Sequence, residues 1–123
     1  MNMRFTDLTT WKVAHRLVLL VYKMTGNFPV HERFCLVTQM NRAAVSITSN
    51  IAEGFGRGST KEKIQFYTFS RGSLHELENQ IILAFDLRYI DDVLYDQSMV
   101  VIMDVHRLLN AFIQKTRQFQ MTS

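Results

Sequence analysis

Three alternating glycines around an arginine, Gly54-Phe55-Gly56-Arg57-Gly58, are the residues that most suggest chemistry. Glycine-rich loops that cradle nucleotide phosphates have the spacing G-x-x-x-x-G-K-[ST] and follow a strand, and this segment meets neither condition. A weaker alternative stays open, in which backbone N–H groups at the start of the next helix bind one phosphate together with Arg57 and Lys61. The favoured interpretation is a helix–helix turn in which glycine supplies a positive φ.

Other catalytic and metal-binding patterns are missing from the sequence. A di-iron bundle needs Glu-x-x-His motifs, and none of the four histidines has a glutamate three residues before it. His75-Glu76 begins like the zinc motif H-E-x-x-H, but Asn79 occupies the place of the second histidine. No G-x-S-x-G segment occurs. We therefore predict no enzymatic activity, no metal and no cofactor.

Composition predicts a single helical domain over residues 1–123. The chain is 47% hydrophobic, with five glycines and one proline, too few for the frequent turns of a β-rich fold. One cysteine allows no internal disulfide, which suits a reducing compartment. The longest apolar run, residues 17–22, is far short of the roughly 20 residues that span a membrane. We expect a cytoplasmic protein without a membrane partner.

Apolar periodicity predicts four helices, over residues 8–25, 32–55, 60–89 and 92–118. Asp7 is the predicted N-cap of the first helix, and Ser59 with Glu62 fits a capping box at the third. Asp91-Asp92 form the turn before the fourth. Short connections make neighbouring helices antiparallel, so the predicted fold is all-α, an up-down-up-down four-helix bundle.

Small residues on one face of the second helix predict close helix packing. That face reads Leu36, Met40, Ala43, Ile47, Asn50 and Gly54, and small side chains let helix axes approach. Gly72 inside the third helix is unfavourable there by about 1 kcal/mol relative to alanine, which suggests that a neighbour packs closely against it.

Two further stripes predict a second covered face. They are Val13, Leu17, Leu20 and Met24 on the first helix, and Phe69, Leu83 and Leu87 within a mixed stripe on the third. A helix at the edge of a small bundle needs only one apolar stripe. The sequence leaves open whether the second stripe faces the bundle or another subunit.

Charge is segregated along the chain although the net charge is only +3. Residues 1–71 hold ten Lys and Arg against four Asp and Glu, residues 72–106 hold one against seven, and residues 107–123 hold three against none. The predicted topology places both termini and the turn at residues 56–59 at one end of the bundle. We expect that end to be basic and the opposite end to be acidic.

The segments Arg42 to Ile47 and Ser49 to Ser59 resemble the signature of the bacterial 23S ribosomal RNA intervening-sequence protein family. The resemblance extends over about residues 4–113, with departures at Thr48, where the family usually has proline, and at Asn41, where a basic residue is frequent. It implies an antiparallel four-helix bundle assembled into pentameric rings. A related branch, the accessory proteins of diversity-generating retroelements, forms basic pentameric barrels that engage nucleic acid.

Residues and resemblance together predict a non-enzymatic homo-oligomer, a pentamer, that serves as a scaffold for RNA or DNA. The predicted nucleic-acid contacts are Arg42, Arg57, Lys61 and Lys63. The predicted oligomer contacts are the second stripes, Val13, Leu17, Leu20, Met24, Phe69, Leu83 and Leu87. The alternative is an adaptor that binds another protein without nucleic acid.

Overall fold

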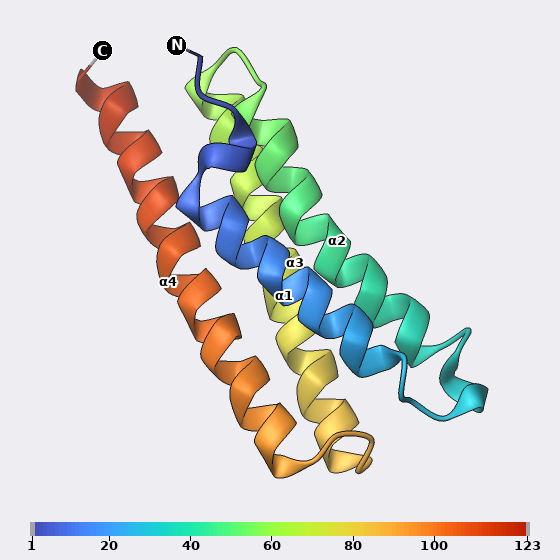
Figure 1. Cartoon of the computed structure of the whole chain (residues 1–123). Helices are drawn as coiled ribbons and strands as arrows, with labels where there is room; N and C mark the ends of the chain where they lie inside the picture. The colour runs from blue at the N-terminus through green and yellow to red at the C-terminus, as the bar shows by residue number, and fades with distance from the viewer. Residues whose placement is uncertain (1, 123) are drawn as a thin grey trace.

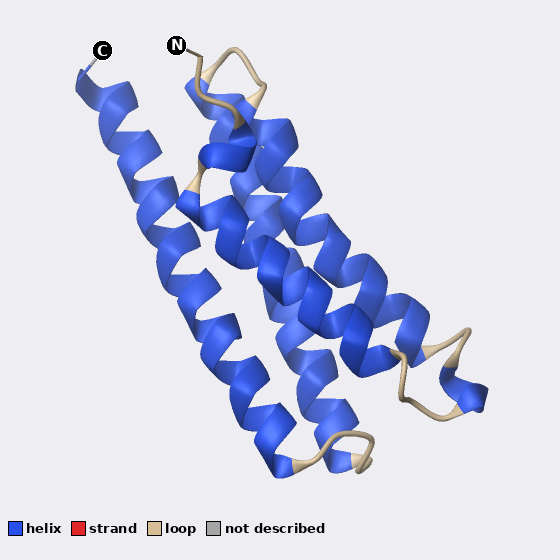
Figure 2. Ribbon diagram, in the orientation of Figure 1, coloured by secondary structure: helices blue, strands red, loops and turns tan. Residues whose placement is uncertain are grey.

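The computed structural model describes residues 2–122, with side chains for residues 2–119, and this part of the chain contains helices and no strand (Figure 2). Two short 3-10 turns accompany four long helices (Figure 1). These elements are η1 (Phe5–Asp7), α1 (Thr9–Thr25), η2 (Val30–Glu32), α2 (Leu36–Phe55), α3 (Thr60–Asp86) and α4 (Asp92–Thr122).

Successive helices run antiparallel and form a closed square. Both α1 and α3 pack against α2 and α4, with α2 and α3 in the most extensive contact. Figure 1 shows both chain ends and the α2–α3 turn at the upper end, and the other two connections at the lower end. The predicted up-down-up-down bundle is therefore confirmed.

Capping hydrogen bonds confirm the predicted N-terminal ends of the third and fourth helices. The backbone N–H of Glu62 donates to Ser59 Oγ over 3.1 Å, and that of Leu94 donates to Asp91 Oδ1 over 2.8 Å. The prediction for Asp7 is wrong. Its carboxylate accepts from the backbone N–H of Arg4 and closes η1, so α1 begins after Leu8.

The second and third helices are shorter than predicted. After Pro29 the chain forms η2, and α2 begins only at Leu36. α3 ends at Asp86 because Arg88 adopts a left-handed φ of 67°. The backbone N–H of Tyr89 donates to Ala84 O, and that of Arg88 to Phe85 O, each over 2.9 Å. This is a Schellman ending with arginine where glycine is usual.

The core lies along the axis of the bundle, and α2 and α3 meet closely in it. The Ser70 hydroxyl donates to Ile47 O across the two helices over 2.7 Å. A Cβ on Gly54 would lie only 2.7 Å from Cε1 of Tyr67, which itself is buried. The predicted close packing of the small-residue face of α2 is thus confirmed.

Two expectations about glycine are wrong. No described glycine has a positive φ, so the α2–α3 turn does not depend on left-handed glycine conformations. Gly72 is exposed, and a Cβ there would meet nothing within 4 Å, so none of the residues that the structure describes packs against it.

The second stripe on α1 is divided by the structure. Leu17 and Met24 are 0% and 2% exposed and belong to the core of the bundle, so their side chains cannot contact another subunit. Val13 and Leu20 are half-buried at its edge. On α3, the side chains of Phe69, Leu83 and Leu87 are exposed.

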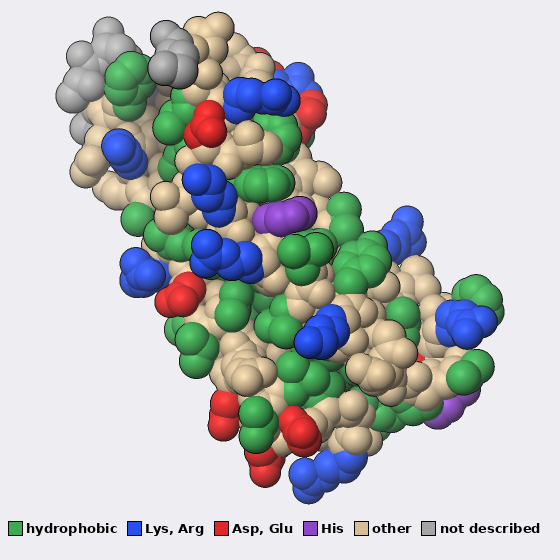
Figure 3. Space-filling view, in the orientation of Figure 1, with side chains coloured by type: hydrophobic (Ala, Val, Ile, Leu, Met, Phe, Trp, Pro, Cys, Tyr) green, Lys and Arg blue, Asp and Glu red, His purple; other side chains and the backbone are tan. Residues whose placement is uncertain are grey.

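The acidic side chains gather at the predicted end, whereas the basic side chains are not confined to the opposite end. Figure 3 shows Asp and Glu clustered at the lower end, where the α3–α4 connection lies, and Lys and Arg spread over the rest of this face. Among residues 2–122, no helix is long and apolar enough to cross a membrane.

Candidate nucleic-acid interface

Arg57, in the α2–α3 turn, is held by carboxylates of its own chain. Its Nη2 lies 2.5 Å from Glu53 Oε1, and its Nη1 lies 3.7 Å from Glu62 Oε2. The guanidinium also lies 4.6 Å from the centre of the Phe66 ring. A phosphate arriving here would compete with two carboxylates, so the charge of Arg57 is largely offset before any ligand binds.

Lys63, on the first turns of α3, closes the end of α2. Its Nζ donates to Phe55 O over 2.6 Å and reaches Gly54 O at 3.4 Å. The last carbonyls of a helix lack partners within the helix and carry its negative dipole end. Lys63 therefore has a structural partner that accounts for its position.

The start of α3 does not offer an open anion site. Ser59 accepts from the backbone N–H of Glu62, and the Glu62 carboxylate lies 3.3 Å from Ser59 Oγ. A second anion would meet the Glu62 charge at this helix start. The geometry favours the interpretation of a capped turn over that of a phosphate contact.

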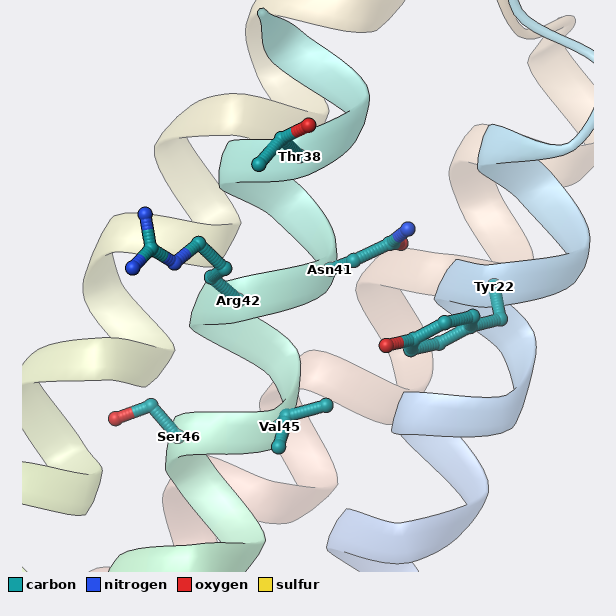
Figure 4. Close-up of a pocket in the computed structure, with 6 residues that line it drawn as sticks. All are labelled: Tyr22, Thr38, Asn41, Arg42, Val45 and Ser46. Carbon is teal, nitrogen blue, oxygen red and sulfur yellow. The ribbon is translucent and has the colours of Figure 1, made fainter. Parts of the chain in front are cut away.

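Arg42 and Lys61 are exposed, and they lie far apart. Arg42 is in the middle of α2, about 20 Å along the helix axis from the turn that holds Arg57. It borders an open hollow of about 530 Å³ over α2 (Figure 4). Figure 4 shows Arg42 and Ser46 projecting toward α3, and Asn41 and Val45 toward Tyr22 of α1. The four predicted cations do not form one site.

Asn41, where the resembled family often has a basic residue, joins two helices. Its Oδ1 accepts a hydrogen bond from the Thr25 hydroxyl over 2.9 Å, and Thr25 is buried at the end of α1. This position serves the α1–α2 packing and leaves Arg42 as the cation of the hollow.

Some titratable groups outside the predicted interface are held by the fold. His106 Nε2 lies 2.8 Å from Glu78 Oε1, which links α4 to α3. The Tyr89 hydroxyl donates to Glu32 Oε2 over 2.7 Å, and this hydrogen bond raises the pKa of Tyr89. Burial raises the pKa of Tyr67 to about 12. The described residues contain no group of three or more His, Cys, Asp or Glu placed to hold a metal.

Comparison with known proteins agrees with the bundle. The chain is similar to a solved structure, a protein with unknown function from the S23 ribosomal protein family of Bacteroides thetaiotaomicron VPI-5482. The match has a TM-score of 0.79 and 18% sequence identity, and it covers 85% of this chain and 95% of the other. At this identity the likeness establishes the fold alone. Among curated proteins none matches.

The family comparison covers nearly the whole chain. The model of the 23S rRNA-intervening sequence protein family matches residues 6–122, which include all four helices and both 3-10 turns except Phe5. The chain belongs to the 23S rRNA-intervening sequence protein family.

Proposed function

We propose that this protein is a non-enzymatic, homo-oligomeric scaffold that binds RNA through its basic surface. The observation that carries the proposal is the one-sided distribution of charge. The acidic residues gather at the end that holds the α3–α4 connection, and the rest of the surface is left with an excess of Lys and Arg. Such a surface attracts a polyanion at long range and binds phosphates with strong salt dependence.

Self-association would multiply this charge. Phe69, Leu83 and Leu87 lie on one side of α3 at helical spacing and are each about half exposed. Exposed apolar groups that share one helix face favour burial against a partner. In the pentameric ring implied by the family resemblance, each of the five subunits would bury this side of α3.

Electrophoretic mobility shift with a structured RNA tests the binding. We expect a complex at low salt that dissociates as the salt concentration rises. Failure to bind at low salt would contradict the proposal.

Light scattering tests the assembly, for which we expect about 72 kDa, five times the chain mass of 14.4 kDa. A mass near 14.4 kDa would contradict the ring.

A protein-binding adaptor is the second candidate, and the same exposed apolar side of α3 supports it. The two functions separate in a pull-down from nuclease-treated lysate. A partner that RNA bridges is lost after this treatment, whereas a protein that binds the α3 side directly is retained.

A further inference from the structure

α1 exposes cations that no carboxylate offsets. Lys12, Arg16 and Lys23 are exposed, and the helix contains no Asp or Glu from Thr9 to Thr25. Within residues 2–119, none of these three side chains has an ion pair or hydrogen bond, in contrast to Arg57 and Lys63. Their charge is fully available to a ligand.

Helical periodicity turns these cations outward and toward α4. Tyr22 and Thr25 mark the α2 side of α1, since Tyr22 borders the hollow over α2 and Thr25 donates to Asn41. Arg16 falls on the other flank, beyond the core-facing residues, and α1 packs against α4 on that flank. Lys12 and Lys23 point away from the core.

α4 adds cations to the same face. Asp104 is the last acidic side chain in the sequence, and Arg107 and Lys115 follow it, both exposed. His106 contacts Glu78 and so marks the α3 side of α4. Lys115 lies on the opposite flank, toward α1, and Arg107 points outward, where it lies 3.6 Å from Asp104. Figure 3 shows this face directly, with Lys and Arg distributed along α1 and α4.

We propose that this α1–α4 face, made of Lys12, Arg16, Lys23, Arg107 and Lys115, holds the phosphate backbone of RNA without reading its bases. The proposal rests on the RNA binding proposed above and assigns it to a surface other than the α2–α3 turn. Lys12 and Lys23 lie about 16 Å apart along the axis of α1 and so reach several successive phosphates. Contacts between Lys or Arg and phosphates give affinity without sequence preference.

The bundle geometry keeps this face free for a ligand. α1 lies diagonally across the bundle from α3, because both pack against α2 and α4. The exposed apolar residues Phe69 and Leu83 belong to α3, and Leu87 directly follows it. The side of α3 proposed for self-association therefore does not itself overlap the α1–α4 face.

Two double variants with the same loss of charge test the assignment. Lys12→Gln with Arg16→Gln removes two cations from the α1–α4 face, and Arg42→Gln with Lys61→Gln removes two from elsewhere. Binding of a labelled RNA hairpin is measured by fluorescence anisotropy as salt rises. We expect the first variant to bind about tenfold more weakly, with a slope of log K against log salt shallower by about 1.8, as for two lost contacts. The second variant should stay within about twofold of the natural protein.

Trp11 provides a second readout at the proposed surface. It is the only tryptophan of the chain, it precedes Lys12, and its ring stacks on His15 with 4.6 Å between the ring centres. RNA bound at the α1–α4 face should change the emission of Trp11. Two results together would overturn the assignment. The natural protein would bind RNA without a change in Trp11 emission, and the Lys12 and Arg16 variant would bind with unchanged affinity.

Each remaining outcome distinguishes this inference from the proposed function. No binding by the natural protein at low salt overturns both. Loss of binding only in the Arg42 and Lys61 variant overturns the α1–α4 face and leaves RNA binding standing. Clear preference between two hairpins of unrelated sequence overturns recognition of the backbone alone. Equal binding of anionic phospholipid vesicles, with the same dependence on Lys12 and Arg16, overturns RNA as the specific partner.

Thermal unfolding controls for folding. Lys12 and Arg16 are exposed and unpaired, so the variant should melt with the natural protein. If it does not, Lys23→Gln with Lys115→Gln tests the same face, with the same expected loss of affinity and the same contradicting result.

Discussion

At the scale of single residues, the structure separates cations that serve the fold from cations that are free. Lys63 closes the carbonyl end of α2, and Arg57 is held by Glu53 and Glu62. Lys12 and Arg16 have no such partner in the part of the chain that the structure describes. Arg88 serves the fold in another way, through its backbone. Its left-handed φ of 67° ends α3, and an L side chain is strained in that conformation.

Replacement of Arg88 by glycine should therefore stabilise the protein. Glycine adopts a positive φ without the clash of a Cβ, and we expect a gain of about 1 kcal/mol in the free energy of unfolding. The contact of Arg88 with the Phe85 ring, at 6.0 Å, is long and offsets little of this gain. Chemical denaturation measures the change. Arg33→Gly, at a residue in the right-handed region, is the control and should give no gain.

Alkaline pH should destabilise the bundle through Tyr67. Its pKa is raised to about 12 in the folded chain, against about 10 when unfolded, so the unfolded chain loses its proton first. The free energy of unfolding is then unaffected below pH 10 and falls between pH 10 and 12, by about 1 kcal/mol per pH unit at most. Denaturation at several pH values tests this. A Tyr67→Phe variant with the same fall over that range would argue against Tyr67 as the cause.

At the scale of elements, the contact between α2 and α3 organises the bundle. Gly54 lies against Tyr67, Ser70 bonds to the backbone of α2, and the hydroxyls of Ser46 and Ser73 lie 2.8 Å apart. Gln80 is buried in α3, with its Nε2 bonded to Glu76 and its Oε1 without a partner among the described residues. Small side chains permit this closeness, since a larger group would separate the helices.

Two glycine-to-alanine replacements should have opposite effects. Gly54→Ala places a Cβ 2.7 Å from Tyr67 Cε1 and 2.9 Å from Phe66 Cβ, so we expect a loss of about 1 to 3 kcal/mol in the free energy of unfolding. Gly72→Ala adds a Cβ in open space inside a helix, where we expect a gain of about 0.5 to 1 kcal/mol. Denaturant titration of the pair checks both signs. An unchanged Gly54→Ala variant would disprove the close approach.

At the scale of the whole molecule, three properties occupy different parts of the surface. Acidic residues gather at one end, the unpaired cations Lys12, Arg16 and Lys23 lie on the outer side of α1, and the half-exposed apolar side chains of Phe69 and Leu83 lie on α3. The square arrangement of the helices keeps α1 and α3 apart. A chain with this surface can associate with its copies through one side and present charge on another.

Polar replacement on α3 should dissociate the assembly without unfolding the chain. Phe69→Gln with Leu83→Gln removes apolar groups that are 51% and 46% exposed in the single chain, so its stability should change little. The mass measured by light scattering should fall toward 14.4 kDa. Leu17→Ala is the contrasting variant. It should destabilise the bundle by about 2 to 5 kcal/mol, because Leu17 is fully buried. An unchanged mass for the α3 variant would contradict association through this side.

Sequence alone determined the number of helices, their order and their antiparallel packing. Periodicity of 3.6 residues, the Ser59 capping box and the Asp91 turn are local signals, and each acts within a few residues. The small face of α2 likewise indicated a close neighbour before that neighbour was known. The family signature, too, lies in the sequence itself.

Only the tertiary structure decided which side chains are free. The apolar stripe of Val13, Leu17, Leu20 and Met24 has the same helical periodicity whether the bundle core or another subunit covers it. Only the positions of the other helices show that Leu17 and Met24 are buried in the core. The charge of Arg57 is equally visible in the sequence, but its offset by two carboxylates depends on the geometry of the turn. Burial and pairing are relations between distant residues, and folding sets them by bringing the four helices together.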